Sequence, residues 1–207
     1  MVGTGVALNG IILAGGKSRR LGIDKTVLEI AGKRLLRIVM ETVRNVADDL
    51  IIVTNAPHLF QGLPARLTGD VEPGAGPLGG ILSGLLVSSE PYSLVVGCDM
   101  PFLNAELLAY LRGCVEDYDV VMPEAGGNLE PLHAVYSKAC IEPIQTLLAQ
   151  RNFTVIDLMN EVRVRYVSEE EIDRFDPTRL TFFNINTPQD LEKARRELER
   201  RGILERP

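Results

Sequence analysis

A basic, glycine-containing segment near the N-terminus has the residue types of a polyphosphate-binding loop. Residues 13–25 read LAGGKSRRLGIDK and concentrate four cations, Lys17, Arg19, Arg20 and Lys25, in a chain that is acidic overall. Glycine lets the backbone approach a phosphate closely, and cationic side chains form charge-assisted hydrogen bonds with phosphate oxygens. A glycine pair alone would indicate only a tight turn. The cluster of cations directly after an apolar run favours phosphate binding.

This loop differs from two common phosphate-binding motifs. A Walker A loop requires a glycine five positions before Gly16, where this chain has Ile11. The G-x-G-x-x-G fingerprint of dinucleotide-binding folds is also absent from the turn. The sequence therefore disfavours a P-loop nucleoside triphosphatase and a Rossmann dehydrogenase.

Two carboxylates in predicted loops could take part in the same chemistry. Asp99 ends the apolar run 93–98, and Asp70 lies in the segment GDVEP. In an open α/β sheet the ligand crevice forms at the carboxyl ends of the strands, where an aspartate can hold Mg²⁺ against a triphosphate. Either residue taken alone would be an ordinary turn aspartate.

Other kinds of chemistry find little support. The histidines, His58 and His133, lie far apart and have no partnered serine or cysteine motif, which argues against a hydrolase triad and a zinc site. Three widely spaced cysteines disfavour a disulfide framework and fit a reducing compartment.

The net charge and the N-terminal segment argue against two classes of partner, nucleic acids and membranes. Lys and Arg number 22 against 28 Asp and Glu, a net charge of -6, which argues against a protein that coats nucleic acid. The apolar N-terminal segment has no cation before Lys17, and no run of 18 apolar residues occurs in the chain. We expect neither an export signal nor a membrane helix, and therefore a cytoplasmic protein with neither nucleic acid nor membrane as a partner.

Strand and helix patterns alternate along the 207 residues, as in an α/β protein with a mostly parallel sheet covered by helices on both faces. The length predicts a single domain, 1–207. We predict strands at 6–13, 50–54, 93–98, 119–122 and 132–136, and helices at 33–47, 81–87, 104–113, 138–149, 154–160 and 187–201. Asn104 and Thr187 are the expected N-caps of their helices. The loop 123–130 is the expected mobile segment.

Five segments in one order resemble the molybdenum cofactor guanylyltransferase family. They are ILAGG-x-S-x-RLG-x-DK from residue 12, GPLGGI from 76, CDMPFL from 98, EPL from 130 and FNINTP from 183. The match extends over nearly the whole chain. Several of these motifs are shared by many nucleotidyltransferases, whereas the double glycine together with the CDMPFL and NINTP segments is more specific.

The resemblance implies a fold, a reaction and partners. The fold is a three-layer α/β/α, Rossmann-like, GT-A-like nucleotidyltransferase with a mostly parallel mixed sheet. The reaction transfers GMP from Mg-GTP to the terminal phosphate of molybdenum-bound molybdopterin, releases pyrophosphate and forms the guanine dinucleotide cofactor. Mg²⁺ is the implied cofactor. GTP and molybdenum-molybdopterin are the implied ligands, with molybdenum-insertion proteins or molybdoenzyme chaperones as further partners.

Site residues follow from the resemblance by position. On the nucleotide side these are Leu13, Ala14 and Gly15 lining the site, Lys25 at a phosphate, Asn55 at the nucleotide, Asp70 facing the guanosine, and Asp99 binding both GTP and Mg²⁺. Asn184 and Asn186 would lie toward the pterin. Attack of one phosphate on another requires charge neutralisation and in-line positioning, so the expected catalytic groups are Arg19, Lys25 and Asp99.

Two alternatives remain open. The same fold could serve a cytidylyltransferase or another NTP transferase that acts on molybdopterin or on a sugar or alcohol phosphate. Cytidylyl relatives tend to have Ala-Ala-Gly where this chain has Ala14-Gly15-Gly16, which favours guanine. The second alternative is a non-catalytic GTP-binding protein that delivers the cofactor.

Overall fold

The computed structural model describes residues 6–15, 28–30 and 32–202. Strands are β1 (Leu8–Leu13), β2 (Glu29–Ile30), β3 (Lys33–Arg34), β4 (Asp49–Val53), β5 (Arg66–Thr68), β6 (Tyr92–Gly97), β7 (Val120–Ala125), β8 (Asn128–Leu129), β9 (His133–Ser137) and β10 (Val164–Val167). Helices are α1 (Leu35–Arg44), α2 (Gly76–Val87), α3 (Ala105–Gly113), α4 (Ile141–Ala149), α5 (Glu169–Asp173) and α6 (Pro188–Arg200).

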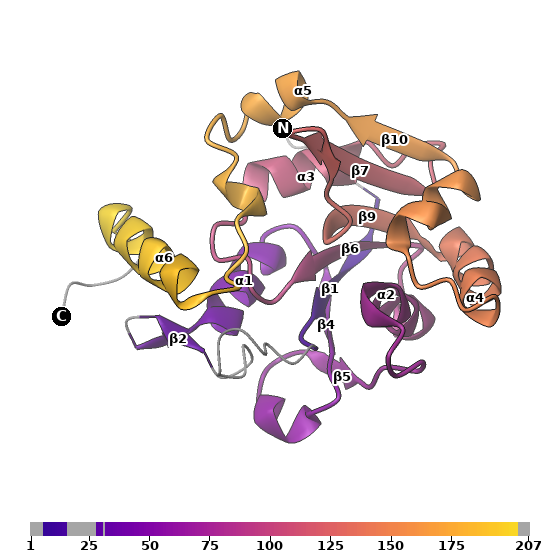
Figure 1. Cartoon of the computed structure of the whole chain (residues 1–207), viewed down its shortest axis with the longest axis horizontal. Coiled ribbons are helices and arrows are strands. Elements are labelled where there is room, and N and C mark those ends of the chain that lie inside the picture. The colour runs from indigo at the N-terminus through magenta and orange to yellow at the C-terminus, as the bar shows by residue number, and fades with distance from the viewer. Residues whose placement is uncertain (1–5, 16–27, 31, 203–207) are drawn as a thin grey trace.

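A mixed sheet with helices on both faces forms the centre of the molecule (Figure 1). Its strand order is β10-β7-β9-β6-β1-β4-β5, and β8 pairs with β7. β9 runs antiparallel to its neighbours β6 and β7, whereas β6, β1, β4 and β5 are mutually parallel. The predicted three-layer α/β/α fold with a mostly parallel mixed sheet is therefore confirmed.

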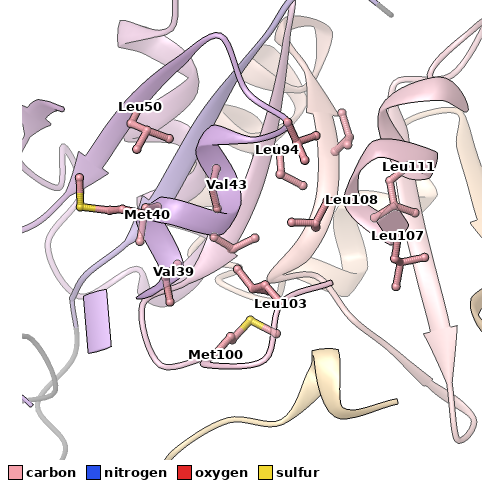
Figure 2. Packing of buried hydrophobic residues seen from close by; sticks show 14 of the residues in the cluster. Val39, Met40, Val43, Leu50, Leu94, Met100, Leu103, Leu107, Leu108 and Leu111 are labelled. Atoms are coloured by element: carbon pink, nitrogen blue, oxygen red, sulfur yellow. The ribbon is translucent and has the colours of Figure 1, made fainter. Parts of the chain in front are cut away.

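Two apolar cores lie on opposite faces of the sheet. Helices α1 and α3 pack on one face with α5, and α2 and α4 pack on the other. Figure 2 shows side chains of α1 and α3 converging with Met100 and Leu103, which follow strand β6. Because these two residues are buried, the loop after β6 is fixed to the core on one side of Asp99.

A third, smaller apolar cluster joins the C-terminal helix to the β2–β3 hairpin. Ala194 and Leu198 of α6 pack with Ile30 of β2, Ile38 of α1 and Ile185. The cluster holds the segment that precedes α6 against the main body of the protein, beside the loop that follows β6.

The register of the parallel strands brings their carboxyl ends to one edge. Leu13 pairs with Val53 on one side and with Gly97 on the other, and Val53 pairs with Thr68. His133, the first residue of antiparallel β9, pairs with Val96 near the same edge. The loops after β1, β4, β5 and β6 and the turn before β9 therefore lie along one edge of the sheet.

The expected helix caps are confirmed. The Asn104 side chain accepts hydrogen bonds from the backbone N–H groups of Glu106 and Leu107. Thr187 and Asp190 form a capping box at the start of α6, where Pro188 is the first helical residue. These local signals place the starts of α3 and α6 correctly.

Three predicted elements differ from the structure. The helix predicted at 81–87 begins at Gly76, and the one predicted at 154–160 is a 3₁₀ segment, Val155–Asn160. The predicted loop 123–130 contains the end of β7, a turn and β8, while its expected mobility stays a prediction. Gly126 and Gly127 have φ values of 60° and 71°, which a two-residue hairpin turn of type I′ requires and which glycine adopts without steric cost.

Helix α2 packs unusually close to strand β1. A Cβ atom at Gly84 would lie 2.7 Å from atoms of the buried Ile11 side chain, and one at Gly80 would lie 3.2 Å from the Leu13 side chain. Since Gly80 faces Leu13 and Gly84 faces Ile11, α2 runs antiparallel to β1. Its N-terminus therefore lies at the edge of the sheet where the parallel strands end.

Among the described helices, none combines the length and the apolar character that crossing a membrane requires.

We predict that Gly84→Ala destabilises the fold. Overpacking a core costs roughly 1–3 kcal/mol, more than the roughly 0.5–1 kcal/mol by which alanine favours a helix over glycine. The midpoint of urea unfolding should fall. The matched control is Gly113→Ala in α3, where a Cβ would meet no atom of the described part of the chain within 4 Å. It should leave the midpoint unchanged or raise it. Equal or greater stability of Gly84→Ala would contradict the close packing.

Candidate active site

Backbone hydrogen bonds between neighbouring parallel strands continue for one residue beyond the end of each strand. The N–H of Ala14 donates to Val53 O at 2.9 Å, that of Cys98 to Leu13 O at 3.1 Å, and that of Thr54 to Thr68 O at 2.8 Å. The loops therefore begin from fixed positions. Four predicted site residues lie one or two positions after a strand end: Ala14, Asn55, Asp70 and Asp99.

The two residues after β1 differ in exposure. Ala14 is buried and Gly15 is exposed, and a Cβ built on Gly15 would meet no atom of the described residues within 4 Å. The predicted catalytic residues Arg19 and Lys25 lie outside the described residues, so their assignment stays a prediction.

The Asn55 side chain orders the loop after β5. Its Oδ1 accepts the backbone N–H of Asp70 at 3.0 Å. Its amide NH₂ has no partner in the described part of the chain and could donate to a ligand. The sequence predicts only nucleotide contact for Asn55, and the structure adds this role in holding a second predicted residue.

Asp70 connects the same loop with helix α2. Its Oδ1 accepts the N–H of Glu72 at 3.1 Å and lies 3.4 Å from the Ser83 hydroxyl. That hydroxyl accepts the N–H of Val71 at 2.9 Å and donates to Gly79 O at 2.7 Å. Gly79 gives the carboxylate space, because a Cβ there would lie 3.0 Å from Asp70 Oδ1. Ser83 and Gly79 are supporting residues that no sequence motif suggested for this purpose.

The position of Asp99 depends on space at Gly97 and on a backbone hydrogen bond from Ile185. Its half-buried carboxylate folds back over Gly97, where a Cβ would lie 2.6 Å from Asp99 Oδ1. Its backbone carbonyl accepts the N–H of Ile185 at 3.0 Å. A side chain at position 97 would displace the carboxylate, so Gly97 is a site residue that the sequence analysis missed.

The bond to Ile185 places the two predicted pterin-side asparagines near Asp99. Asn184 is half-buried and its Nδ2 donates to Phe182 O at 2.9 Å. Asn186 is exposed, and its backbone N–H donates to Asp190 at the start of α6. The structure therefore brings Asn184, Asn186 and Asp99 together at one end of the strand edge.

Glu130 is a further carboxylate at this edge. Its N–H donates to Pro123 O at 3.0 Å, and its carbonyl accepts the N–H of His133 at 3.0 Å. The side chain has no hydrogen-bond or ion-pair partner among the described residues, and burial raises its pKa to about 6. Glu130 belongs to the EPL motif, which gave it no role.

The carboxylates fit a magnesium-nucleotide better than a preformed metal centre. In the described part of the chain no cluster of three or more His, Cys, Asp or Glu side chains could hold an ion. Mg²⁺ is commonly bound through one or two carboxylates together with substrate phosphates and water. Asp99 and Asp70 follow strands three positions apart in the sheet, roughly 14 Å at the usual strand spacing. A spacing of this size fits an elongated ligand that extends along the edge better than a single ion shared by both carboxylates.

Comparison with known proteins identifies the family. Residues 10–163 match the profile of the MobA-like NTP transferase domain. The chain is 42% identical to a probable molybdenum cofactor guanylyltransferase of Pelotomaculum thermopropionicum, over 90% of this chain and 91% of that protein. It is 40% identical to the molybdenum cofactor guanylyltransferase of Desulfosudis oleivorans, over 91% and 94% of the two chains. This chain belongs to the molybdenum cofactor guanylyltransferase family. The resemblance read from the motifs is thereby confirmed, and the protein is a nucleotidyltransferase.

A solved structure of the family has the same fold. The chain superposes on molybdopterin-guanine dinucleotide biosynthesis protein A of Archaeoglobus fulgidus with a TM-score of 0.82, at 28% identity, over 93% of this chain and 100% of that one.

The raised pKa of Glu130 predicts a pH-dependent effect on stability. Between its usual pKa of 4.5 and about 6, the folded protein binds more protons at this carboxyl than the unfolded chain does. This group's contribution to the free energy of unfolding therefore falls as the pH rises through that window. Glu130→Gln removes the ionisation, so it should gain stability relative to the wild type between pH 4.5 and pH 7.

Urea unfolding of both proteins across this range measures the difference. Glu124→Gln, an exposed carboxylate of the same hairpin, is the control and should show no such trend. A constant difference between Glu130→Gln and the wild type would mean that Glu130 titrates normally.

Proposed function

We propose that this enzyme transfers GMP from GTP to the terminal phosphate of molybdenum-bound molybdopterin and releases pyrophosphate. The names of the two relatives that share 40–42% of its residues over most of the chain support the substrates. The observation that carries the chemistry is the shared strand edge. On it Gly97 leaves space for the Asp99 carboxylate, Ile185 donates to the Asp99 backbone carbonyl, and the Asn55 side chain accepts the N–H of Asp70.

On this proposal the nucleotide lies across the ends of β6, β1, β4 and β5. Leu13, Ala14 and Gly15 line its site at the centre, where the backbone of Gly15 is accessible. Asn55 and Asp70 face the guanosine, and Asp99 lies at the phosphate end. Arg19 and Lys25, in the basic segment of the sequence that follows Gly15, screen the charge of the polyphosphate.

The reaction exchanges one phosphoanhydride bond for another. An oxygen of the acceptor phosphate attacks the α-phosphorus of GTP, and the bond from that phosphorus to the oxygen bridging to the β-phosphate breaks. The electron pair leaves with pyrophosphate. A phosphate monoester, with a second pKa of about 6, is already largely ionised at neutral pH, so the step does not require a general base. The barrier arises mainly from bringing anions together, which positioned charges lower.

Mg²⁺ would be held by Asp99 with the phosphates, and when bound it neutralises charge on phosphate oxygens. The acceptor would approach from the side of Asn184 and Asn186, beyond Asp99 from the guanosine. The product would pass to molybdenum-insertion proteins or molybdoenzyme chaperones. Cys98, Cys114 and Cys140 form no disulfide with one another, which supports a location in the reducing cytoplasm.

Asp99→Asn is the variant that tests the phosphate end of the site. Loss of one preorganised electrostatic contact typically costs roughly 10²–10³ in rate, so pyrophosphate release should fall by at least that factor. The amide keeps the shape of the side chain and the backbone bond to Ile185, so the melting temperature should change little. Glu116→Gln, an exposed carboxylate between α3 and β7, is the control and should have normal activity. Near-normal turnover in Asp99→Asn would remove the proposed role of Asp99.

Nucleotide selectivity tests the proposed reaction itself. Pyrophosphate release is measured with each of the four nucleoside triphosphates and Mg²⁺, with and without molybdenum-bound molybdopterin. We expect release only with GTP and the acceptor together. Equal or faster release with CTP would favour the cytidylyltransferase. Binding of GTP without release would favour a non-catalytic delivery protein.

A further inference from the structure

The segment that contacts Asp99 is itself anchored by a buried polar network. We call residues 181–186 the C-terminal strap. Its first residue, Thr181, is fully buried, and the Thr181 Oγ1 accepts the backbone N–H of Asn104 at 3.1 Å. The buried carboxylate of Asp176 accepts the Thr181 N–H at 2.8 Å. These bonds fix the beginning of the strap above the N-terminus of helix α3.

His133 links the strap to the central sheet. It is the first residue of β9 and is fully buried. Its Nε2 lies 3.4 Å from Thr181 Oγ1, and its ring packs edge-on against the ring of Phe182, with centroids 4.8 Å apart. Burial lowers the pKa of His133 to about 3, although the nearby Asp176 carboxylate opposes the shift. The imidazole is therefore neutral at physiological pH.

Stability alone does not account for a histidine at this position. Its Nδ1 is buried and has no hydrogen-bond partner in the described part of the chain. An unpaired buried polar atom is destabilising, and a phenylalanine ring would fill similar space without that penalty. The feature that distinguishes histidine here is the contact between its Nε2 and the Thr181 hydroxyl.

A short series of contacts connects this histidine with the acceptor side of the site. The strap continues from Thr181 to Phe182, whose carbonyl accepts the Asn184 Nδ2 at 2.9 Å. The next residue, Ile185, donates its N–H to Asp99 O at 3.0 Å. Displacement of Thr181 and Phe182 would therefore be transmitted to Asn184 and to the backbone of Asp99. Within the described residues, Asn55 and Asp70, which lie after β4 and β5, make no hydrogen bond or ion pair with this network, and strands β6 and β1 separate them from it.

We propose that His133 is a positioning residue that holds the C-terminal strap in the conformation required to bind the acceptor phosphate ester beside Asp99. The assignment of the acceptor rests on the proposed function. The position of the strap itself can be measured without turnover.

The test compares His133→Phe with His133→Gln. Phenylalanine keeps the ring volume and removes Nε2, whereas the glutamine amide can reach Thr181 from nearly the position of Nε2. Val135→Ala is the matched control, because Val135 is buried on the same strand two residues along. Its truncation removes apolar contacts from the cluster against which Phe182 packs, but it removes none of the hydrogen bonds that hold the strap. Urea unfolding, hydrogen–deuterium exchange of the Ile185 amide, and the KM values for GTP and molybdenum-bound molybdopterin are measured for each protein.

His133→Phe should have about the stability of the wild type, because it removes the unpaired Nδ1 but also leaves the buried Thr181 hydroxyl without its Nε2 partner. Exchange at the Ile185 amide should nevertheless be faster. The KM for the acceptor should rise roughly three- to tenfold, the effect of losing one hydrogen bond, while the KM for GTP stays within about twofold. His133→Gln should restore protection of Ile185 and the acceptor KM. Val135→Ala should lose stability with both KM values unchanged.

Two results would overturn the proposal. One is unchanged exchange at Ile185 in His133→Phe. The other is that His133→Phe changes stability, Ile185 exchange and the KM values as Val135→Ala does, or that His133→Gln does not restore Ile185 protection and the acceptor KM. Either outcome would mean that His133 has a purely structural role. Absence of transfer by the wild-type protein would count against the proposed function alone, since exchange at Ile185 still decides whether His133 positions the strap.

Discussion

The site depends on the parallel register of β6, β1 and β4. Leu13 pairs with both Gly97 and Val53. The loops that carry Ala14, Asp99 and Asn55 therefore begin at the same position along the strand direction. Bonds just past the strand ends extend that alignment into the loops. A shift of one residue in any of these strands would turn its side chains to the opposite face, into a core packed for other residues, so the packing of the two cores fixes the register. The positions of the site residues follow from the packing of the core.

Small residues allow the close approaches that complete this arrangement. Gly84 and Gly80 bring α2 against β1, Gly79 gives space to the Asp70 carboxylate, and Gly97 gives space to Asp99. Each would be unfavourable in a helix or strand on intrinsic preference. In α2 the close approaches that these glycines permit accompany a helix that begins at Gly76, five residues before the one predicted at 81–87.

Much of the fold was predictable because its strongest elements carry local signals. The strands β1, β4 and β6 are apolar runs rich in β-branched residues, and α3 and α6 have recognisable caps. The sequence analysis did not predict β5 or β10, which are short and only partly buried. In the site, the strand-end positions of Asp99 and Asn55 could be anticipated. The contact of Ile185 with Asp99 could not, because it joins residues 86 positions apart and depends on how α6 packs on the β2–β3 hairpin.

The central claim is that one nucleotide lies along a single strand edge with its phosphates at Asp99. A crystal structure of the protein with Mn²⁺ and a non-hydrolysable GTP analogue tests it most directly, because the anomalous signal locates the ion. The account predicts the ion in direct contact with the Asp99 carboxylate and the guanine beside Asn55 and Asp70. An ion held away from Asp99, or a guanine bound on the side of β9 and β7, would contradict it.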